Sequence, residues 1–299
     1  MMTQNTPLPS APACPGPDPT PRGPQSFQMP HGAVDTHAHV IGLPPDFPLE
    51  EGRSYTAPAA TPASYLHMLD ATGMTYGVLV QVSVHGVDNR LLLQTLRAQP
   101  HRLRGIAVMP LGLPQRAYED ARSAGVVGLR LNVLYGGGIG FDMLEGYGAL
   151  AKEMGWHLQF IVDTRDLPAL APRIARLPVP FVIDHMGHFP TAEVSPDDAS
   201  FQTLVSLVRD GGWVKLSGAY RLSHQPPPYE ETIAHAQRLV EAAPDRCVWG
   251  SDWPHVANWG TMPNVGDLLD TLALWVPSEV QRNDILVKNP GCLYGFDKL

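Results

Sequence analysis

Eight short apolar segments alternate with longer segments of helical periodicity from Gly32 onward, and this alternation limits the fold more than any other feature of the chain. Apolar runs of this length, bounded by turn residues, are typical of strands buried on both faces of a parallel sheet. Eight strands, each followed by a helix, predict an α/β fold of the (β/α)8 TIM-barrel type. The expected strands are Val34–Ile41, Tyr76–Ser83, Arg104–Met109, Val126–Val133, His157–Val162, Phe181–His185, Trp213–Ser217 and Cys247–Ser251.

The segments between these strands predict helices, and several begin with a capping signal such as Thr61-Pro62. An open doubly wound sheet is the rival fold. No strand is followed by Gly-x-Gly-x-x-Gly, and the cluster Gly136-Gly137-Gly138 carries no helix start. The barrel is therefore favoured. The expected helices are Pro62–Ala71, Asp88–Ala98, Pro114–Ala124, Asp142–Met154, Asp166–Arg176, Asp197–Arg209, Tyr229–Ala243, Val265–Trp275 and Ser278–Val287.

Composition limits the remaining possibilities. Residues 1–30 contain nine prolines and few large apolar side chains, so we expect a disordered or loosely draped tail before a single domain over residues 31–299. The net charge of −8 argues against nucleic acid or an anionic membrane as a partner, and we expect neither a membrane span nor a signal peptide. Three widely spaced cysteines without a Cys-x-x-Cys pair indicate the cytoplasm.

Polar residues at the ends of three strands suggest an active centre, because TIM barrels place catalytic groups there. His37 and His39 alternate on one strand and therefore share a face. His185 follows the sixth strand and Asp252 the eighth. Together they could hold one divalent ion such as Zn²⁺. Without metal, Asp252 could instead act as general base on water while the histidines stabilise a carbonyl oxygen as charge develops.

Three motifs carry a resemblance to a known family: Asp35-Thr36-His37-Ala38-His39, Ile183-Asp184-His185-Met186-Gly187, and Trp249-Gly250-Ser251-Asp252-Trp253-Pro254-His255. Together they resemble the amidohydrolase superfamily, in the branch similar to 2-pyrone-4,6-dicarboxylate lactonase. The likeness extends in order over about residues 33–296. It implies a TIM-barrel hydrolase with His37, His39, His185 and Asp252 as its catalytic cluster.

The resemblance also implies residues that bind substrate. Arg130 and Arg221 match family arginines that hold substrate carboxylates, a pairing that suits the planar guanidinium. Ser83, His85 and Asn89 are expected to line the pocket. The chain departs from the family where a second basic pair would follow Arg130, since it has Tyr135-Gly136-Gly137-Gly138, and where Ile161 replaces a substrate-facing tyrosine. We therefore expect a lactone with one carboxylate or another polar group.

The expected function is hydrolysis of a small carboxylated lactone by water attack on the ring carbonyl. Either no cofactor is required or one divalent ion, zinc first, binds the same four residues, because no bridging lysine or glutamate for two metals occurs in Val126–Val133. Alternatives on the same scaffold are a sugar-lactone hydrolase, a lactone isomerase, and a zinc-dependent decarboxylase or hydratase. A non-catalytic binding barrel is a different class, and the presence of all four cluster residues argues against it. The sequence gives no oligomeric state.

Overall fold

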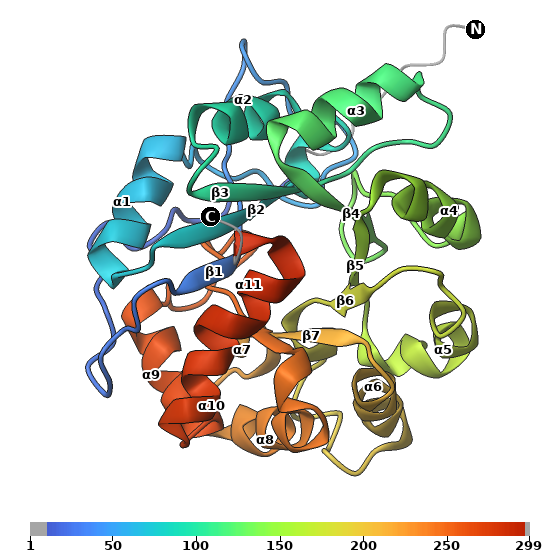
Figure 1. Ribbon diagram of the computed structural model, residues 1–299. Helices are drawn as coiled ribbons and strands as arrows, with labels where there is room; N and C mark the ends of the chain where they lie inside the picture. Colours follow the sequence, from blue (N-terminus) through green and yellow to red (C-terminus); the bar gives the residue numbers. More distant parts are fainter. Residues whose placement is uncertain (1–10, 297–299) are drawn as a thin grey trace, which may run out of the picture.

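Eight parallel strands form the centre of the molecule in the computed structural model, which describes residues 11–296. They pair in sequence order from β1 to β8, and helices surround the ring (Figure 1). A parallel bridge between Ala38 and Trp253 joins the first strand to the segment after the last and so closes the ring. The predicted barrel is confirmed. The strands are β1 Val34–Ala38, β2 Tyr76–Val80, β3 Leu103–Ala107, β4 Val126–Asn132, β5 His157–Ile161, β6 Phe181–Ile183, β7 Trp213–Leu216 and β8 Cys247–Trp249.

The observed strands end earlier than the sequence suggests. Val34–Ile41 was expected to be one strand, yet β1 ends at Ala38, and β6 ends at Ile183 before a 3₁₀ turn over His185–Gly187. The apolar pattern runs on because these loops are buried as well. Polar side chains at the strand ends therefore lie on short, fixed turns.

The helices follow the expected spacing, with two main differences. A short helix, α7, begins directly after β7, where none was expected. The last predicted helix, Ser278–Val287, is longer and is interrupted by a π-helical turn over Asp284–Lys288. The bounds are α1 Pro62–Thr72, α2 Arg90–Ala98, α3 Gln115–Ala124, α4 Leu144–Met154, α5 Leu167–Ile174, α6 Ala199–Arg209, α7 Ala219–Leu222, α8 Ile233–Ala242, α9 Val265–Trp275, α10 Glu279–Asn283 and α11 Asn289–Tyr294.

Local signals explain where α1 begins and ends. The Thr61 side chain accepts a hydrogen bond from the Ser64 backbone N–H, and Pro62 occupies the first turn, where its missing N–H costs nothing. Gly73 ends the helix at φ 79°, a conformation that glycine adopts without a Cβ clash. The capping signal at Thr61-Pro62 thus marks the helix start correctly.

One end of the barrel is filled by apolar side chains, which we call the apolar layer. Two of them, Tyr294 and Phe296, come from α11 and the residues after it, and Phe296 stacks on Tyr76 at the start of β2. This end of the barrel is packed, so the site must lie at the carboxyl ends of the strands. The members of the layer are Val34, Val78, Val80, Ile106, Tyr294 and Phe296.

Residues 11–30, expected to be disordered or loosely draped, instead lie against the barrel as a strap with specific contacts. The Cys14 N–H donates to the Thr56 carbonyl at 2.9 Å, and Thr56 N–H donates to the Pro12 carbonyl at 2.8 Å. The Arg22 guanidinium pairs with Asp267 and Asp270 of α9. Backbone and ionic contacts fix this proline-rich segment, together with Cys14, Phe27 and Met29, which pack in or against the hydrophobic core. The part of the expected tail before residue 11 lies outside the described residues.

Candidate active site

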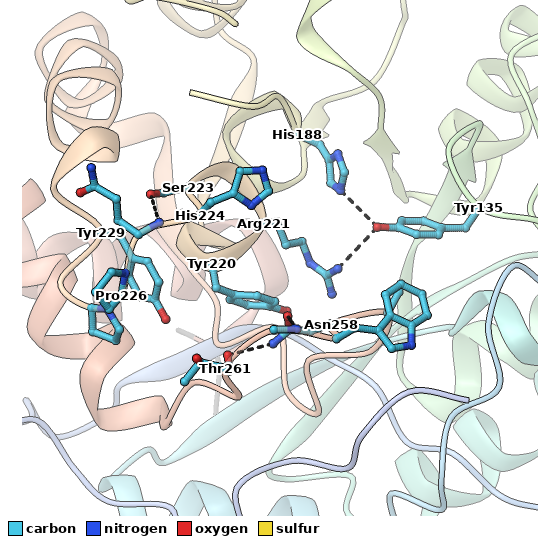
Figure 2. Close-up of a pocket in the computed structure, with 15 residues that line it drawn as sticks. Tyr135, His188, Tyr220, Arg221, Ser223, His224, Pro226, Tyr229, Asn258 and Thr261 are labelled. Atoms are coloured by element: carbon cyan, nitrogen blue, oxygen red, sulfur yellow. Dashed lines mark hydrogen bonds between the residues drawn. The ribbon is translucent and has the colours of Figure 1, made fainter. Parts of the chain in front are cut away.

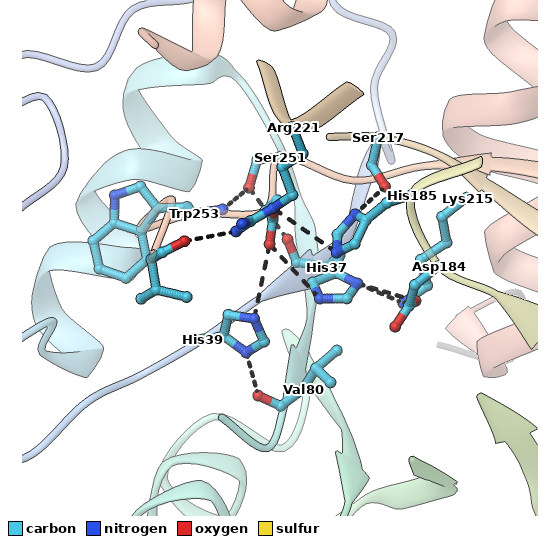
Figure 3. A network of polar contacts seen from close by, with 12 residues as sticks. His37, His39, Val80, Asp184, His185, Lys215, Ser217, Arg221, Ser251 and Trp253 are labelled. Carbon is cyan, nitrogen blue, oxygen red and sulfur yellow. Dashed lines mark hydrogen bonds and ion pairs between the residues drawn. The ribbon is translucent and has the colours of Figure 1, made fainter. Parts of the chain in front are cut away.

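Four side chains predicted to form the catalytic cluster converge at the carboxyl end of the barrel (Figure 3). His37 lies on β1, His39 directly after it, His185 after β6 and Asp252 after β8. Asp252 Oδ1 lies 3.8 Å from Nε2 of His37 and 3.8 Å from Nε2 of His39. Asp252 Oδ2 lies 3.8 Å from Nε2 of His185. Every one of these side chains is buried.

Backbone geometry holds two of these residues in place. Asp252 has φ 61° and His185 has φ 50°, both in the left-handed region that costs a residue with a side chain about 1 kcal/mol or more. The Asp252 N–H donates to the His37 carbonyl at 2.8 Å, so the strained turn is tied to β1. The strain is concentrated where the reactive side chains must point into the barrel.

Asp35 ties the first strand to the turn that carries Asp252. Its carboxylate accepts hydrogen bonds from the Ser251 N–H and hydroxyl, both at 2.7 Å, and from Tyr65 at 3.1 Å. Burial raises the pKa of Asp35 to about 6. Sequence reasoning assigned Asp35 no role, although it precedes the His-x-His pair within the same motif.

Asp252 is ionised and asymmetrically bound. Burial opposes its ionisation, but the neighbouring Arg221 charge outweighs burial and holds the pKa of Asp252 well below its usual value. Arg221 Nε donates to Asp252 Oδ2 at 2.5 Å and the Tyr220 hydroxyl donates to it at 2.7 Å. Oδ1 accepts no hydrogen bond from any residue between 11 and 296. One carboxylate oxygen is thus anchored, and the other faces the histidines.

The protons on His39 and His185 are set by different partners. His39 Nδ1 lies 2.7 Å from the Val80 carbonyl, which can only accept, so Nδ1 carries the proton and Nε2 is a bare lone pair toward Asp252. His185 Nδ1 lies 2.9 Å from the Ser217 hydroxyl, which can donate or accept. Burial lowers the pKa of His39 to about 4 and that of His185 to about 3, so both rings are neutral near pH 7.

A second group of charges lies deeper in the barrel, against His37. Lys215 Nζ donates to the Thr36 carbonyl and to Gln159 Oε1, both at 2.8 Å. It also lies 3.2 Å from His37 Nδ1 and 3.5 Å from Asp184 Oδ1. Burial lowers the pKa of Lys215 to about 8, while Asp184, despite burial, has its pKa held well below its usual value by His37 and Lys215.

The two arginines that were predicted to bind a carboxylate both line a small cavity beside Asp252, which we call the chamber. Arg130, on β4, is buried and pairs through Nε with Asp184 Oδ2 at 3.3 Å. Arg221, on α7, also donates to the Val256 carbonyl at 2.9 Å. We use the name polar layer for eight buried polar residues around Asp252 and Lys215: His37, His39, Arg130, Gln159, Asp184, His185, Lys215 and Asp252, none more than 4% exposed.

The three other predicted pocket residues have different surroundings. Ser83 lines the chamber, with its hydroxyl 3.0 Å from that of Tyr55. His85 instead binds the loop after β1, because its Nε2 accepts from the Gly42 N–H at 3.2 Å and Nδ1 lies 3.2 Å from the Pro48 carbonyl. The Asn89 amide pairs with the Val108 backbone in both directions. Neither His85 nor Asn89 is among the residues that line the chamber, and their role in substrate binding stays a prediction.

An outer pocket of about 480 Å³ adjoins the chamber, and Tyr135 and Arg221 line both (Figure 2). The Tyr135 hydroxyl lies 3.2 Å from His188 Nε2, and Arg221 donates to it at 3.4 Å. Tyr55 of the chamber and His188 of the pocket were not expected, because they lie in loops without periodicity. The pocket lining also includes His224, Tyr229, Asn258 and Trp259.

Comparison with known proteins agrees with this geometry. The family model described as Amidohydrolase matches residues 34–296. The chain is 36% identical to 4-sulfomuconolactone hydrolase of Rhizobium radiobacter, over 95% of this chain and 96% of that protein. This chain is an amidohydrolase. No helix among residues 11–296 is long and apolar enough to cross a membrane.

Further relatives of this amidohydrolase act on lactones, according to their names. It is 33% identical to 2-pyrone-4,6-dicarboxylate hydrolase of Comamonas testosteroni, over 90% of this chain and 92% of that one, and 27% identical to D-galactarolactone isomerase of Agrobacterium fabrum, over 89% and 92%. A crystal structure from Acinetobacter baumannii, named as a probable 2-pyrone-4,6-dicarboxylic acid hydrolase with citric acid bound, superposes with a TM-score of 0.77 at 28% identity, covering 88% of this chain and 99% of that one.

The amidohydrolase cluster has the donor chemistry of a site for one metal ion. His37, His185 and Asp252 each offer a ligand atom, and these atoms lie within 4.8 Å of one another. His37 Nε2 and Asp252 Oδ1 have no hydrogen-bond partner among the described residues. Imidazole nitrogen and carboxylate oxygen suit Zn²⁺. The three residues therefore fit a single divalent ion.

Proposed function

We propose that this amidohydrolase opens a small lactone carrying a carboxylate or a similar anionic group, by attack of water on the ring carbonyl. One observation carries the proposal. The ionised Asp252 carboxylate has one oxygen, Oδ1, without a hydrogen-bond partner among the described residues, and it lies in one chamber with imidazole nitrogens and two buried arginines. The cysteine usage favours a cytoplasmic location.

Asp252 would act as the general base. It takes a proton from water as the water oxygen bonds to the carbonyl carbon, and the protonated carboxyl then gives that proton to the ring oxygen as the ring C–O bond breaks. The products are one hydroxyl group and one carboxylic acid, which loses its proton to solvent near pH 7 and becomes a carboxylate. An N–H from the histidine cluster stabilises the oxyanion that forms on the carbonyl oxygen.

Arg130 and Arg221 would hold the anionic substituent. Arg221 is bound to Asp252, an arrangement that keeps the base weak. A substrate carboxylate competes for the same guanidinium, and sharing Arg221 with it raises the basicity of Asp252. Substrate binding and activation of the base are thereby linked through one side chain.

If one divalent ion binds, His37, His185 and Asp252 would hold it, and the ion would supply Lewis-acid polarisation of the carbonyl. The binding roles of Arg130 and Arg221 are the same with or without it. The histidine and aspartate ligands, rather than thiolates, make zinc the first ion to test.

The names of the relatives favour an anionic lactone as substrate, since one acts on a sulfonated lactone and another on a pyrone dicarboxylate. This chain has Tyr135 where a second basic pair was expected, and Ile161 lines the chamber. A single anion-binding site, formed by Arg130 and Arg221, and the hydroxyl of Tyr135 then favour a lactone with one strongly anionic group.

A lactone isomerase is the second candidate, supported by the similarity to D-galactarolactone isomerase. Isomerisation returns a lactone and releases no net acid, whereas hydrolysis at neutral pH releases one proton for each ring opened. Acid release therefore separates the two reactions.

The test is acid release measured with a pH indicator over a panel of carboxylated, sulfonated and sugar lactones. The wild type is compared with Asp252→Asn, which keeps the size of the side chain and removes the base. We expect hydrolysis of one anionic class, reduced roughly a thousandfold or more in the variant. Product analysis by NMR detects isomerisation. A folded wild type that leaves every anionic lactone intact would overturn the proposal.

A further inference from the structure

We infer that Lys215 is a positioning residue that donates a hydrogen bond to Nδ1 of His37 and so holds the His37 proton on Nε2, the nitrogen that faces Asp252. The two histidines of the His-x-His pair then differ in function. His37 presents an N–H donor toward Asp252, and His39 presents a bare nitrogen toward the same carboxylate.

The partners of Lys215 account for its three protons. The Thr36 carbonyl and Gln159 Oε1 lie 2.8 Å from Nζ and can only accept. The third partner in hydrogen-bond geometry is His37 Nδ1, at 3.2 Å. An ammonium group has no lone pair, so His37 Nδ1 must be the acceptor, and a neutral ring then carries its proton on Nε2.

Asp184 is the competitor for His37 Nδ1. Its Oδ1 lies 3.3 Å from that nitrogen and would favour the opposite tautomer. However, Oδ1 is not in hydrogen-bond alignment with any donor in the described part of the chain, whereas Oδ2 accepts from Gln159 and Arg130. Asp184 thus stabilises the Lys215 charge electrostatically without taking the proton of His37.

His39 carries its proton on the opposite ring nitrogen from His37. The Val80 carbonyl holds the His39 proton on Nδ1, so Nε2 of His39 is free to ligate or accept. A metal held by both histidines needs a bare Nε2 on each. Lys215 therefore opposes metal binding through His37 and favours His37 as a donor to the oxyanion of the proposed reaction, on which this last role rests.

The decisive measurement uses the wild-type protein stripped of metal with a chelator. Nitrogen-15 NMR of labelled histidine distinguishes a protonated ring nitrogen from a bare one, and the signals of His37 are identified by their absence in His37→Asn. We expect the proton on Nε2 of His37 and on Nδ1 of His39. A His37 proton on Nδ1 would overturn the inference, and no variant of Lys215 is needed to reach that result.

Lys215→Met tests the cause, because it keeps the length of the side chain and removes the donor. We expect the His37 proton to move to Nδ1, toward Asp184, and the affinity for Zn²⁺, measured by competition with a chromophoric chelator, to rise roughly 10- to 100-fold. On an accepted lactone, kcat should fall about 100-fold with little change in KM.

Ser217→Ala is the matched control. It removes the hydroxyl beside His185 Nδ1, at a similar depth on the same segment, without touching His37. We expect the His37 tautomer to stay as in the wild type. An unchanged tautomer and zinc affinity in folded Lys215→Met would show that Lys215 has only a packing role. Because the tautomer is read without substrate, failure of the lactonase proposal and failure of this inference give different results.

Discussion

The polar layer and the apolar layer occupy the same barrel and obey opposite physical rules. The polar layer buries ionised groups, which is stabilising only where each charge has a partner. The apolar layer buries Val, Ile, Tyr and Phe side chains, and every methylene removed from water there stabilises the fold. The Lys215 ammonium, 6.0 Å from the Tyr294 ring centroid, marks the boundary between them. We therefore expect substitutions in the polar layer to affect mainly activity and those in the apolar layer to affect mainly stability.

Among the substitutions that test this contrast, we expect the largest effect on activity at Arg130. Arg130→Met should reduce kcat/KM for an anionic lactone roughly a thousandfold, about 4 kcal/mol, because a buried guanidinium that holds an anion is lost. Steady-state kinetics measure it, and Arg130→Lys should recover part of the loss. A matched lactone without the anionic group should be affected far less. Equal losses on both substrates would show that Arg130 is structural.

Truncation of a side chain in the apolar layer should lower stability and leave activity nearly unchanged. Ile106→Ala leaves a cavity among fully buried side chains and should lower the free energy of unfolding by about 2–5 kcal/mol. Urea denaturation measures this, and Ile106→Val, which removes one methyl group, should cost about 1 kcal/mol. At temperatures where the variants are folded, kcat/KM should change less than twofold. A large loss of activity in the folded alanine variant would contradict the division between the layers.

Acid should act on the buried histidines and not on the apolar layer. Burial lowers the pKa of His39, His188 and His255 to about 4 and that of His157 and His185 to about 3. Because the unfolded rings titrate near 6.5, the stability that depends on neutral rings is present above pH 6.5 and decreases as pH falls toward 4. Each ring then withdraws up to about 1.4 kcal/mol per pH unit.

Asp35 acts against this trend. Its pKa is raised to about 6, so its protonated form stabilises the fold as pH falls below that value. One carboxyl group opposes these five rings and three more whose pKa burial also lowers, those of His37, His85 and His235, and we expect the melting temperature to decrease steadily from pH 6.5 to pH 4.5 in scanning calorimetry. A melting temperature that is constant or rising over that range would show that the histidines are not neutral in the folded state.

The fold was predictable because strands buried on both faces leave apolar runs, as in Tyr76–Val80 and Val126–Leu129. The ends of strands were not, since apolar residues such as Val40 and Ile41 continue where the backbone has already left the sheet. The positions of His37, His39, His185 and Asp252 followed from the barrel rule alone, although their catalytic role stays a proposal.

Other residues could not be placed from sequence. His85 ends a 3₁₀ turn over Ser83–His85 and Asn89 comes after it, and the direction of such a turn decides whether a side chain faces the chamber. Lys215, inside Trp-Val-Lys-Leu, gives no sign in the sequence that its partners come from β1, β5 and β6. The strap was misjudged because composition measures apolar content and not the backbone hydrogen bonds that Thr56 supplies.

The strap has a mechanical consequence for the mouth of the barrel. Its Ala13 carbonyl accepts the Trp259 indole N–H at 2.8 Å, and its neighbours bond to Thr56, the residue after Tyr55. Tyr55 belongs to the wall of the chamber and Trp259 to that of the outer pocket. One short length of chain thus connects two loops that lie some 200 residues apart in the sequence. We expect that displacement of one loop by an incoming molecule is transmitted through the strap to the other loop.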